Sequence, residues 1–373
     1  MRRSMMLGMA AVTATGLLLA GCSSDDGSSG DGSSASATGD TAAKPKVGVI
    51  LPDTKSSARW ETADKKYLTE AFDAAGVDSD IQNAQGDATQ FQTIADQMLT
   101  NGVNVLMIVN LDSGSGKAVL AKAKTAGVKT IDYDRLTLGG GADFYVSFDN
   151  TKVGDLQGQG LQKCLTDAGK EKADLAFLEG SPTDNNATLF TAGAKGALKP
   201  KLDSGDYKIV AEQAVDKWDN QVAGTDFEQM YTDTNGKIDG VYAANDGLAN
   251  AAIAILKKNS ANGIPVTGQD ATDQGLQNIL AGDQCMTVYK AVKKEAEAAS
   301  QLAIALAKGT DTASLATGKT ADTESGKDVP SVLLDPQAIY FDNVKDVIAD
   351  GYTTKENVCT AALADACAKA GIS

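Results

Sequence analysis

Residues 103–109 read Val-Asn-Val-Leu-Met-Ile-Val, and this stretch decides the fold class. A strand covered by helices on both faces is apolar on both sides, so a nearly continuous apolar run predicts a strand of a parallel sheet. The preceding segment, 87–100, carries Phe91, Ile94 and Met98 at helical spacing. A helix followed by a buried strand is the unit from which parallel sheets are built.

The same alternation of strand and helix extends in both directions from this stretch. Strands are expected at 46–51, 78–82 and 128–133, and helices at 59–75 and 117–126. After a strand at 144–148 the rhythm restarts. We expect further strands at 174–178, 208–211, 240–243, 265–268 and 286–289, and further helices at 153–165, 187–198, 221–231, 248–258, 273–280 and 291–307.

These units are too numerous for one compact domain. We therefore predict an α/β fold of two similar doubly wound parallel-sheet lobes joined by a three-segment hinge, with crossings near 148–150, 288–290 and 334–337. The expected N-terminal lobe contains residues 44–148 plus 290–334. The expected C-terminal lobe contains residues 149–289 plus 335–373.

Polar and aromatic side chains follow the predicted strands, where open parallel sheets bind their ligands. The set contains Asp53, Arg59, Trp60, Asp134, Arg135, Asp184, Asn185, Asn186, Asp216, Trp218, Asn245, Asp246, Gln269, Asp270 and Lys290. Each could have a structural role, because Asp caps helices, Arg forms surface ion pairs and Trp packs in cores. Their recurrence at the same end of several strands favours a binding site.

This set suits a sugar. Hydroxyl groups donate and accept hydrogen bonds, which Asp, Arg and Asn can complement. A pyranose ring also has apolar C–H faces that suit flat aromatic rings. The only two tryptophans, Trp60 and Trp218, fall at strand ends in different lobes. They are therefore expected to cover the two faces of one sugar ring.

Several of these stretches resemble the sugar-binding proteins of ABC importers. The resemblance is to the type I periplasmic binding proteins of the ribose/galactose superfamily, and most closely to the D-xylose-binding proteins, over residues from about 46 to about 352. It rests on residues 58–60 (Ala-Arg-Trp), 133–135 (Tyr-Asp-Arg), 144–150 (Phe-Tyr-Val-Ser-Phe-Asp-Asn), 180–187 (Gly-Ser-Pro-Thr-Asp-Asn-Asn-Ala), 198–200 (Leu-Lys-Pro), 245–246 (Asn-Asp), 268–270 (Gly-Gln-Asp) and 286–290 (Met-Thr-Val-Tyr-Lys).

The resemblance implies a sugar site at matching positions. The implied sugar-binding residues are Arg59, Trp60, Arg135, Asp184, Asn186, Trp218, Asn245, Asp270 and Lys290. The sequence differs from the family at Leu-Pro-Asp-Thr after the first strand, which leaves a role for Asp53 undecided. The Gly-Gly-Gly run at 139–141 also departs from the family, but it falls in a loop.

The resemblance also implies a function without catalysis. The expected ligand is one monosaccharide, with D-xylose favoured, bound by hinge closure of a monomer that needs no cofactor or metal and serves an ABC permease. The alternatives are a sugar-sensing receptor subunit and a binding protein for glucose, arabinose or another sugar. A glycosidase, which needs two carboxylates about 5–10 Å apart, is the enzymatic alternative.

The N-terminus predicts export and a lipid anchor. Arg2 and Arg3 precede an apolar segment too short to span a membrane, and Leu-Ala-Gly-Cys at 19–22 resembles the bacterial lipobox. We expect a signal peptide at 1–21, lipidation of Cys22 and a Ser/Gly/Asp-rich tether over 22–43, so the protein would be extracytoplasmic and held at the cell membrane.

Four further cysteines fit two disulfides outside the cytoplasm. Three pairings are possible. The short separation favours Cys359 with Cys367, which would leave Cys164 with Cys285; free buried thiols are the alternative.

Composition excludes other classes of function. A net charge of −15 argues against a nucleic-acid partner, because binding phosphates requires a basic surface. The chain has no histidine, which removes Ser-His-Asp and Cys-His catalysis and the commonest metal ligand. The run Ser-Gly-Ser-Gly-Lys at 113–117 lacks the first Gly of a phosphate-binding loop, and Ala118 replaces its Ser or Thr.

Overall fold

The computed structural model describes residues 44–372. The predicted signal peptide, Cys22 and the tether lie outside these residues. Within the described part, no helix combines the length and the apolar character needed to cross a membrane.

Seven strands form the larger sheet, in the order β10-β11-β5-β4-β3-β1-β2. Its strands are β1 (Lys46–Leu51), β2 (Asp78–Asn83), β3 (Val105–Ile108), β4 (Lys129–Tyr133), β5 (Phe144–Phe148), β10 (Gly318–Asp322) and β11 (Lys327–Leu334). Neighbouring strands run parallel except β10, which pairs antiparallel with β11 at the edge. We call this sheet with its helices the first lobe.

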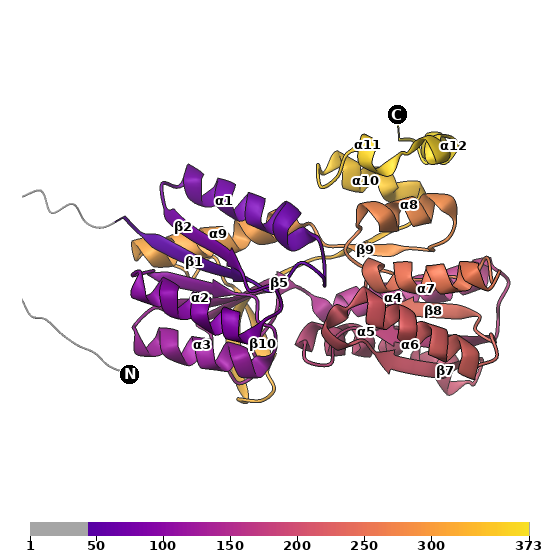
Figure 1. Ribbon diagram of the computed structural model, residues 1–373, viewed down its shortest axis with the longest axis horizontal. Helices are drawn as coiled ribbons and strands as arrows, with labels where there is room; N and C mark the ends of the chain where they lie inside the picture. The colour runs from indigo at the N-terminus through magenta and orange to yellow at the C-terminus, as the bar shows by residue number, and fades with distance from the viewer. Residues whose placement is uncertain (1–43, 373) are drawn as a thin grey trace, which may run out of the picture. The chain divides into compact units, whose positions relative to one another are not determined.

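Strand β3 alternates between the two cores of the first lobe, as a strand covered on both faces must. Val105 and Met107 belong to the core formed with α1 (Lys65–Ala74) and α9 (Val292–Lys308). Leu106 and Ile108 belong to the core formed with α2 (Ala88–Thr100) and α3 (Ser113–Thr125). These two pairs of helices lie on opposite faces of the sheet (Figure 1).

The second lobe is built on a three-stranded parallel sheet in the order β7-β6-β8. Its strands are β6 (Ala173–Glu179), β7 (Tyr207–Ala214) and β8 (Gly240–Ala243). The segment 265–268, predicted as a strand, makes only a single bridge from Val266 to Val241. A second bridge, from Gln269 to Val288, reaches the antiparallel pair of β9 (Thr287–Tyr289) and β12 (Gln337–Ile339).

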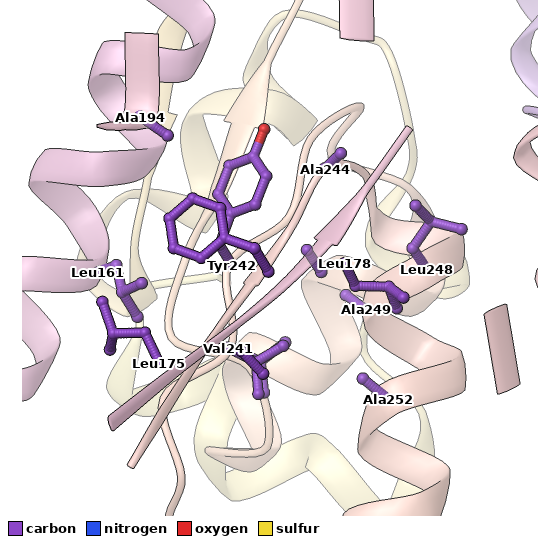
Figure 2. Packing of buried hydrophobic residues seen from close by; sticks show 14 of the residues in the cluster. Leu161, Leu175, Leu178, Ala194, Val241, Tyr242, Ala244, Leu248, Ala249 and Ala252 are labelled. Carbon is purple, nitrogen blue, oxygen red and sulfur yellow. The ribbon is translucent and has the colours of Figure 1, made fainter. Parts of the chain in front are cut away.

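Helices pack on both faces of the second sheet. They are α4 (Asn150–Asp167), α5 (Asn185–Asp203), α6 (Asn220–Asp233) and α7 (Asp246–Lys258). Figure 2 shows Leu161 and Ala194 on one side of the strands and Leu248 and Ala252 on the other. A separate core joins α8 (Asp273–Ala281) to the C-terminal helices α10 (Val344–Ala349), α11 (Lys355–Val358) and α12 (Ala364–Lys369).

The predicted fold class is confirmed: parallel sheets with helices on both faces form two lobes. Helix α9 packs against α1, and β11 pairs with β5, so the chain returns to the first lobe after β9. The lobe boundaries themselves, and the movement of the lobes about the three crossings, stay predictions.

The structure contains two disulfides, Cys164–Cys285 and Cys359–Cys367, the same pairs that the sequence favours. Cys164 lies on α4, and Cys285 precedes β9. The bond therefore joins the first helix of the second lobe to the strand that leads back to the first lobe. Cys359–Cys367 closes a short loop between α11 and α12.

The two disulfides should differ in their effect on stability. The loop-closure model assigns about 5 kcal/mol to a loop as long as that of Cys164–Cys285, and about 2.5 kcal/mol to one as short as that of Cys359–Cys367. We expect the paired Ser variant at 164 and 285 to lower the free energy of unfolding by about twice as much as the pair at 359 and 367. Urea unfolding under non-reducing conditions measures both; a larger loss at 359 and 367 would contradict this order.

Candidate functional site

All nine predicted sugar-binding residues line one cavity between the carboxyl ends of strands from the two lobes. Ser56, Ser57, Asp134, Phe190 and Gln269 complete its wall. We call this cavity the inner pocket. Its volume is about 30 Å³, enough to hold an ordered water molecule. The side chains that line it bond to one another, as described below.

Arg59 and Trp60 lie in the segment between the first strand and α1. Trp60 begins a π-helical turn, Trp60–Asp64, and Arg59 directly precedes it. The sequence predicted an ordinary helix over this stretch. A π turn changes the direction of successive side chains relative to an α-helix, and such turns are frequent at functional sites. Trp60 is buried, and its indole Nε1 donates to Ser56 Oγ at 3.1 Å.

Arg59 is held by three carboxylates behind the inner pocket. Its guanidinium donates to both Asp64 oxygens at 2.9 and 2.7 Å, to Glu295 at 2.6 Å and to Asp134 at 3.1 Å. The guanidinium carbon also lies 4.5 Å from the centre of the Trp60 ring. Arg59 therefore organises Trp60 and Asp134 as well as lining the pocket.

Sequence reasoning missed Asp64 and Glu295. Glu295 lies in the first turn of α9, in a Lys/Glu-rich stretch that reads as a solvated surface. It is fully buried instead. Burial raises the pKa of Glu295 to about 8, although Arg59 opposes this shift. Only the return of α9 to the first lobe brings this carboxyl group to the site, so no local signal could have identified it.

Asp134 connects the two lobes. Its carboxylate accepts from Lys290 Nζ at 3.2 Å and, through Oδ1, from Asn186 Nδ2 at 3.1 Å. Burial opposes ionisation, but Lys290, Arg59 and Arg135 outweigh it and hold the pKa of Asp134 below its ordinary value. Asp134 was a candidate after the fourth strand, although the resemblance did not include it in the site.

Asp184 makes a second connection between the lobes. One oxygen caps α5 by accepting from Asn186 N at 2.9 Å. The other accepts from Trp218 Nε1 at 3.1 Å and forms an ion pair with Arg135, whose Nε lies 3.0 Å away. The capping and binding roles considered for Asp184 therefore coexist, because the two oxygens face different partners.

Asn245 and Asp270 come from the remaining strands of the second lobe. Asn245 caps α7 through Oδ1, and its Nδ2 donates to the Ser56 carbonyl oxygen of the first lobe at 3.2 Å. Asp270 is buried, and the Gln269 side-chain amide donates to its carboxylate. Within residues 44–372 this is the one hydrogen bond made to the Asp270 carboxylate, so Asp270 retains the most accepting capacity of the three pocket carboxylates.

The backbone is strained where it presents these side chains. Asp134, Trp218 and Asp270 have φ values of 60°, 56° and 97°, a region that non-glycine residues seldom occupy. Such strain concentrates at functional sites, where surrounding contacts enforce it. Gly180 supports the arrangement, since a Cβ there would overlap the Trp218 indole.

Asp246 ties the strained turn at Asp270 to the hinge strand β9. The cap of α7 is Asn245 and not Asp246, which the sequence offered as a cap, and the Asp246 carboxylate turns away into the core. It accepts from Thr272 N and Thr287 Oγ1, both at 2.8 Å, and from Gln284 Nε2 at 2.8 Å. Three chain segments that carry pocket residues therefore meet at one buried carboxylate.

The titration of Asp246 gives a testable pH dependence. Burial raises its pKa from 3.8 to about 7, so in this range the folded protein binds a proton that the unfolded chain has lost. The free energy of unfolding should therefore fall as pH rises from about 4 to about 7, and this contribution should level off above that. Thermal unfolding at about pH 5 and about pH 8 measures the difference.

The Asp246→Asn variant should reduce this difference, because an amide does not ionise. Asp132, whose pKa burial also raises to about 7, preserves part of the dependence in the variant. An unchanged difference between the two pH values in Asp246→Asn would show that Asp246 does not titrate as described.

The charges of the inner pocket balance. Three carboxylates, Asp134, Asp184 and Asp270, face three cations, Arg59, Arg135 and Lys290. Such a lining favours a neutral ligand rich in hydrogen-bonding groups. Within the described residues no cluster of three or more Cys, Asp or Glu side chains could hold a metal ion.

Comparison with known proteins places the chain in a family. The periplasmic binding protein domain family matches residues 47–311. The chain belongs to the periplasmic binding protein family. The chain is 36% identical to the D-xylose-binding periplasmic protein of Escherichia coli strain K12, over 82% of this chain and 90% of that protein. It is 35% identical to the multiple sugar-binding periplasmic receptor ChvE of Rhizobium radiobacter, over 83% and 90%.

Solved structures of this family agree with the fold. An ABC transporter solute-binding protein from Clostridium phytofermentans with bound β-D-glucose superposes with a TM-score of 0.75 at 29% identity, covering 84% of this chain and 99% of that one. A carbohydrate transporter solute-binding protein from Chloroflexus aurantiacus in complex with D-glucose gives a TM-score of 0.74 at 28% identity, covering 84% and 98%. Periplasmic binding proteins such as these bind solutes and are not enzymes.

Proposed function

We propose that this protein is the sugar-binding subunit of an ABC importer and that the inner pocket binds one neutral monosaccharide, with D-xylose favoured. The observation that carries the proposal is the convergence of all nine predicted residues on one pocket with balanced charges. Two of its relatives, each about a third identical, are named for D-xylose. The receptor named for multiple sugars is equally similar, so glucose and arabinose are the alternatives to test.

Binding would require the lobes to separate and close again. Contacts of Arg135 with Asp184, of Asn186 with Asp134 and of Asn245 with Ser56 join the lobes across the inner pocket. A sugar would replace these contacts with bonds from its hydroxyl groups to the same side chains. A ligand that bonds both lobes binds the closed form preferentially and shifts the population toward it.

The cellular location of the protein is part of the same proposal. An importer subunit outside the cytoplasm must stay near its permease, and lipidation of Cys22 would hold it at the membrane surface through the residues before Lys44. The partners would be the permease subunits, and the protein would act as a monomer. Labelling with a radioactive or clickable fatty acid, lost in Cys22→Ala, tests the anchor.

Titration of the protein from Lys44 onward with D-xylose, D-glucose, L-arabinose, D-ribose and D-galactose tests the ligand. We expect D-xylose to bind with a dissociation constant near about 1 μM, corresponding to about −8 kcal/mol. Calorimetry and tryptophan fluorescence both measure this binding. Tighter binding of another sugar would move the specificity, and no binding of any sugar would refute the proposed function.

A further inference from the structure

A second and larger cavity adjoins the inner pocket. We call it the outer cleft; it has a volume of about 560 Å³ and runs between the two lobes. From the first lobe it is lined by Lys55, Thr89 and Leu111 among others, and from the second by Thr183 and Lys217 among others. This volume falls within the range of about 300–1,000 Å³ typical of small-molecule sites.

The two cavities share one wall. Arg135, Asp184 and Trp218 line both of them. Asp184 links these three side chains, since its Oδ2 accepts from Trp218 Nε1 and forms an ion pair with Arg135. When a sugar takes over the hydrogen bonds of Asp184 and Arg135, the partition between the cavities opens on the side of the outer cleft.

The inner pocket is closed on the side of Lys290. Lys290 lies 5.7 Å from the centre of the Phe148 ring and 5.9 Å from that of Phe190, and it bonds Asp134. This side faces the chain crossings between the lobes, where Arg59 and Glu295 fill the space. A substituent on the bound ring would have room beyond the wall of Arg135, Asp184 and Trp218, which the outer cleft adjoins.

The lining of the outer cleft suits a neutral polar group. Six aspartates face only three cations, which disfavours phosphate or carboxylate substituents. Several of these aspartates are committed to backbone: Asp87 caps α2, Asp112 caps α3 and Asp219 caps α6. Thr89, Gln85 and Lys217 offer side chains for hydroxyl groups, while Leu111 and Trp218 offer apolar surface.

We propose that the outer cleft receives the second sugar unit of a neutral disaccharide whose first unit occupies the inner pocket. This proposal rests on the proposed function, because it needs the first unit to bind there. The ligand class then includes short neutral glycosides as well as the free monosaccharide. Lys55 and Asp219, whose side chains approach to 3.6 Å across the cleft, mark its outer limit.

The test compares D-xylose with the disaccharide xylobiose on three proteins. Thr89→Trp fills the outer cleft from α2, and Thr93→Trp places the same bulk one turn later on the same helix, where the side chain is exposed and outside the cleft. We expect both sugars to bind the unaltered protein and Thr93→Trp. Thr89→Trp should bind D-xylose normally and bind xylobiose at least about tenfold more weakly, a difference of about 1.4 kcal/mol.

The outcomes of this test distinguish a failure of the disaccharide proposal from a failure of the proposed function. Normal D-xylose binding by Thr89→Trp shows that this variant folds. Binding of D-xylose without binding of xylobiose to the unaltered protein would overturn the role of the outer cleft and leave the proposed function intact. Equal loss of xylobiose affinity in both Trp variants, or no loss in Thr89→Trp, would also overturn it. Failure of every sugar to bind would refute the proposed function itself.

Discussion

Asp270→Asn should weaken monosaccharide binding by about 10- to 100-fold while leaving the fold intact. Hydrogen bonds to a charged group contribute about 1.5–3 kcal/mol, and this substitution removes the charge. Asp270 has the greatest free accepting capacity among the pocket carboxylates, because the Gln269 amide is its partner within the described chain. Asn also tolerates the positive φ of 97° at this position, so loss of binding cannot be attributed to backbone strain.

The matched control is Asp73→Asn, and calorimetry measures the sugar affinity of both variants. Asp73 is an exposed residue of α1, far from the pocket lining, so its variant removes the same charge without touching the site. Thermal unfolding of both variants reports on the fold. Affinity of Asp270→Asn within about threefold of the unaltered protein would remove Asp270 from the proposed site.

Trp218→Ala should cause the largest loss, about 100-fold or more. The substitution removes the indole donor to Asp184 and an aromatic ring of a kind that buries about 150–250 Å² in total. Trp218→Phe separates these two effects, because it keeps a ring and loses the donor. We expect Trp218→Phe to lose only about five- to tenfold, the effect of one hydrogen bond of about 1 kcal/mol.

Fluorescence adds an independent measurement on the same variants. The chain has two tryptophans, so any sugar-dependent signal in Trp218→Ala comes from Trp60. A retained signal with weakened affinity would place Trp60 against the sugar, in agreement with its position beside Arg59 and Ser56. Near-normal affinity of Trp218→Ala would contradict the stacking role.

The fold class could be predicted from the sequence because the spacing of apolar residues, which distinguishes strands from helices, depends only on residues close together in the chain. The apolar run at 103–109 predicts a strand covered on both faces, and β3 divides its side chains between two cores as expected. The strand predicted at 265–268 was wrong except for one bridge at Val266. Its apolar residues fit a buried segment, whether or not that segment is a strand. Strand pairing also depends on the segments that lie beside it in the fold, which the local sequence does not specify.

The pocket was predictable where residues follow strands directly. Arg135, Asp184 and Asn245 belong to this group, because the carboxyl ends of parallel strands meet at one edge of each sheet. Glu295 was not recognised as part of the site, and Asp246 was a strand-end candidate that the nine predicted sugar-binding residues left out. Glu295 reaches Arg59 across 236 positions of sequence, and Asp246 looks like one more helix cap until its hydrogen bonds to Thr272 and Thr287 are seen.

The Cys164–Cys285 bond has a consequence for resistance to proteolysis. It joins residues 121 positions apart, and the segment between them contains β6, β7, β8 and the helices between these strands. A single cut anywhere inside this ring leaves both fragments covalently joined. The segments that connect the lobes, next to β5 and β9, lie outside this ring. A protein cut once inside the ring would therefore keep its lobes connected. It would run as one band in a denaturing gel until the disulfide is reduced. An extracytoplasmic protein nicked in this way would therefore stay in one covalent piece.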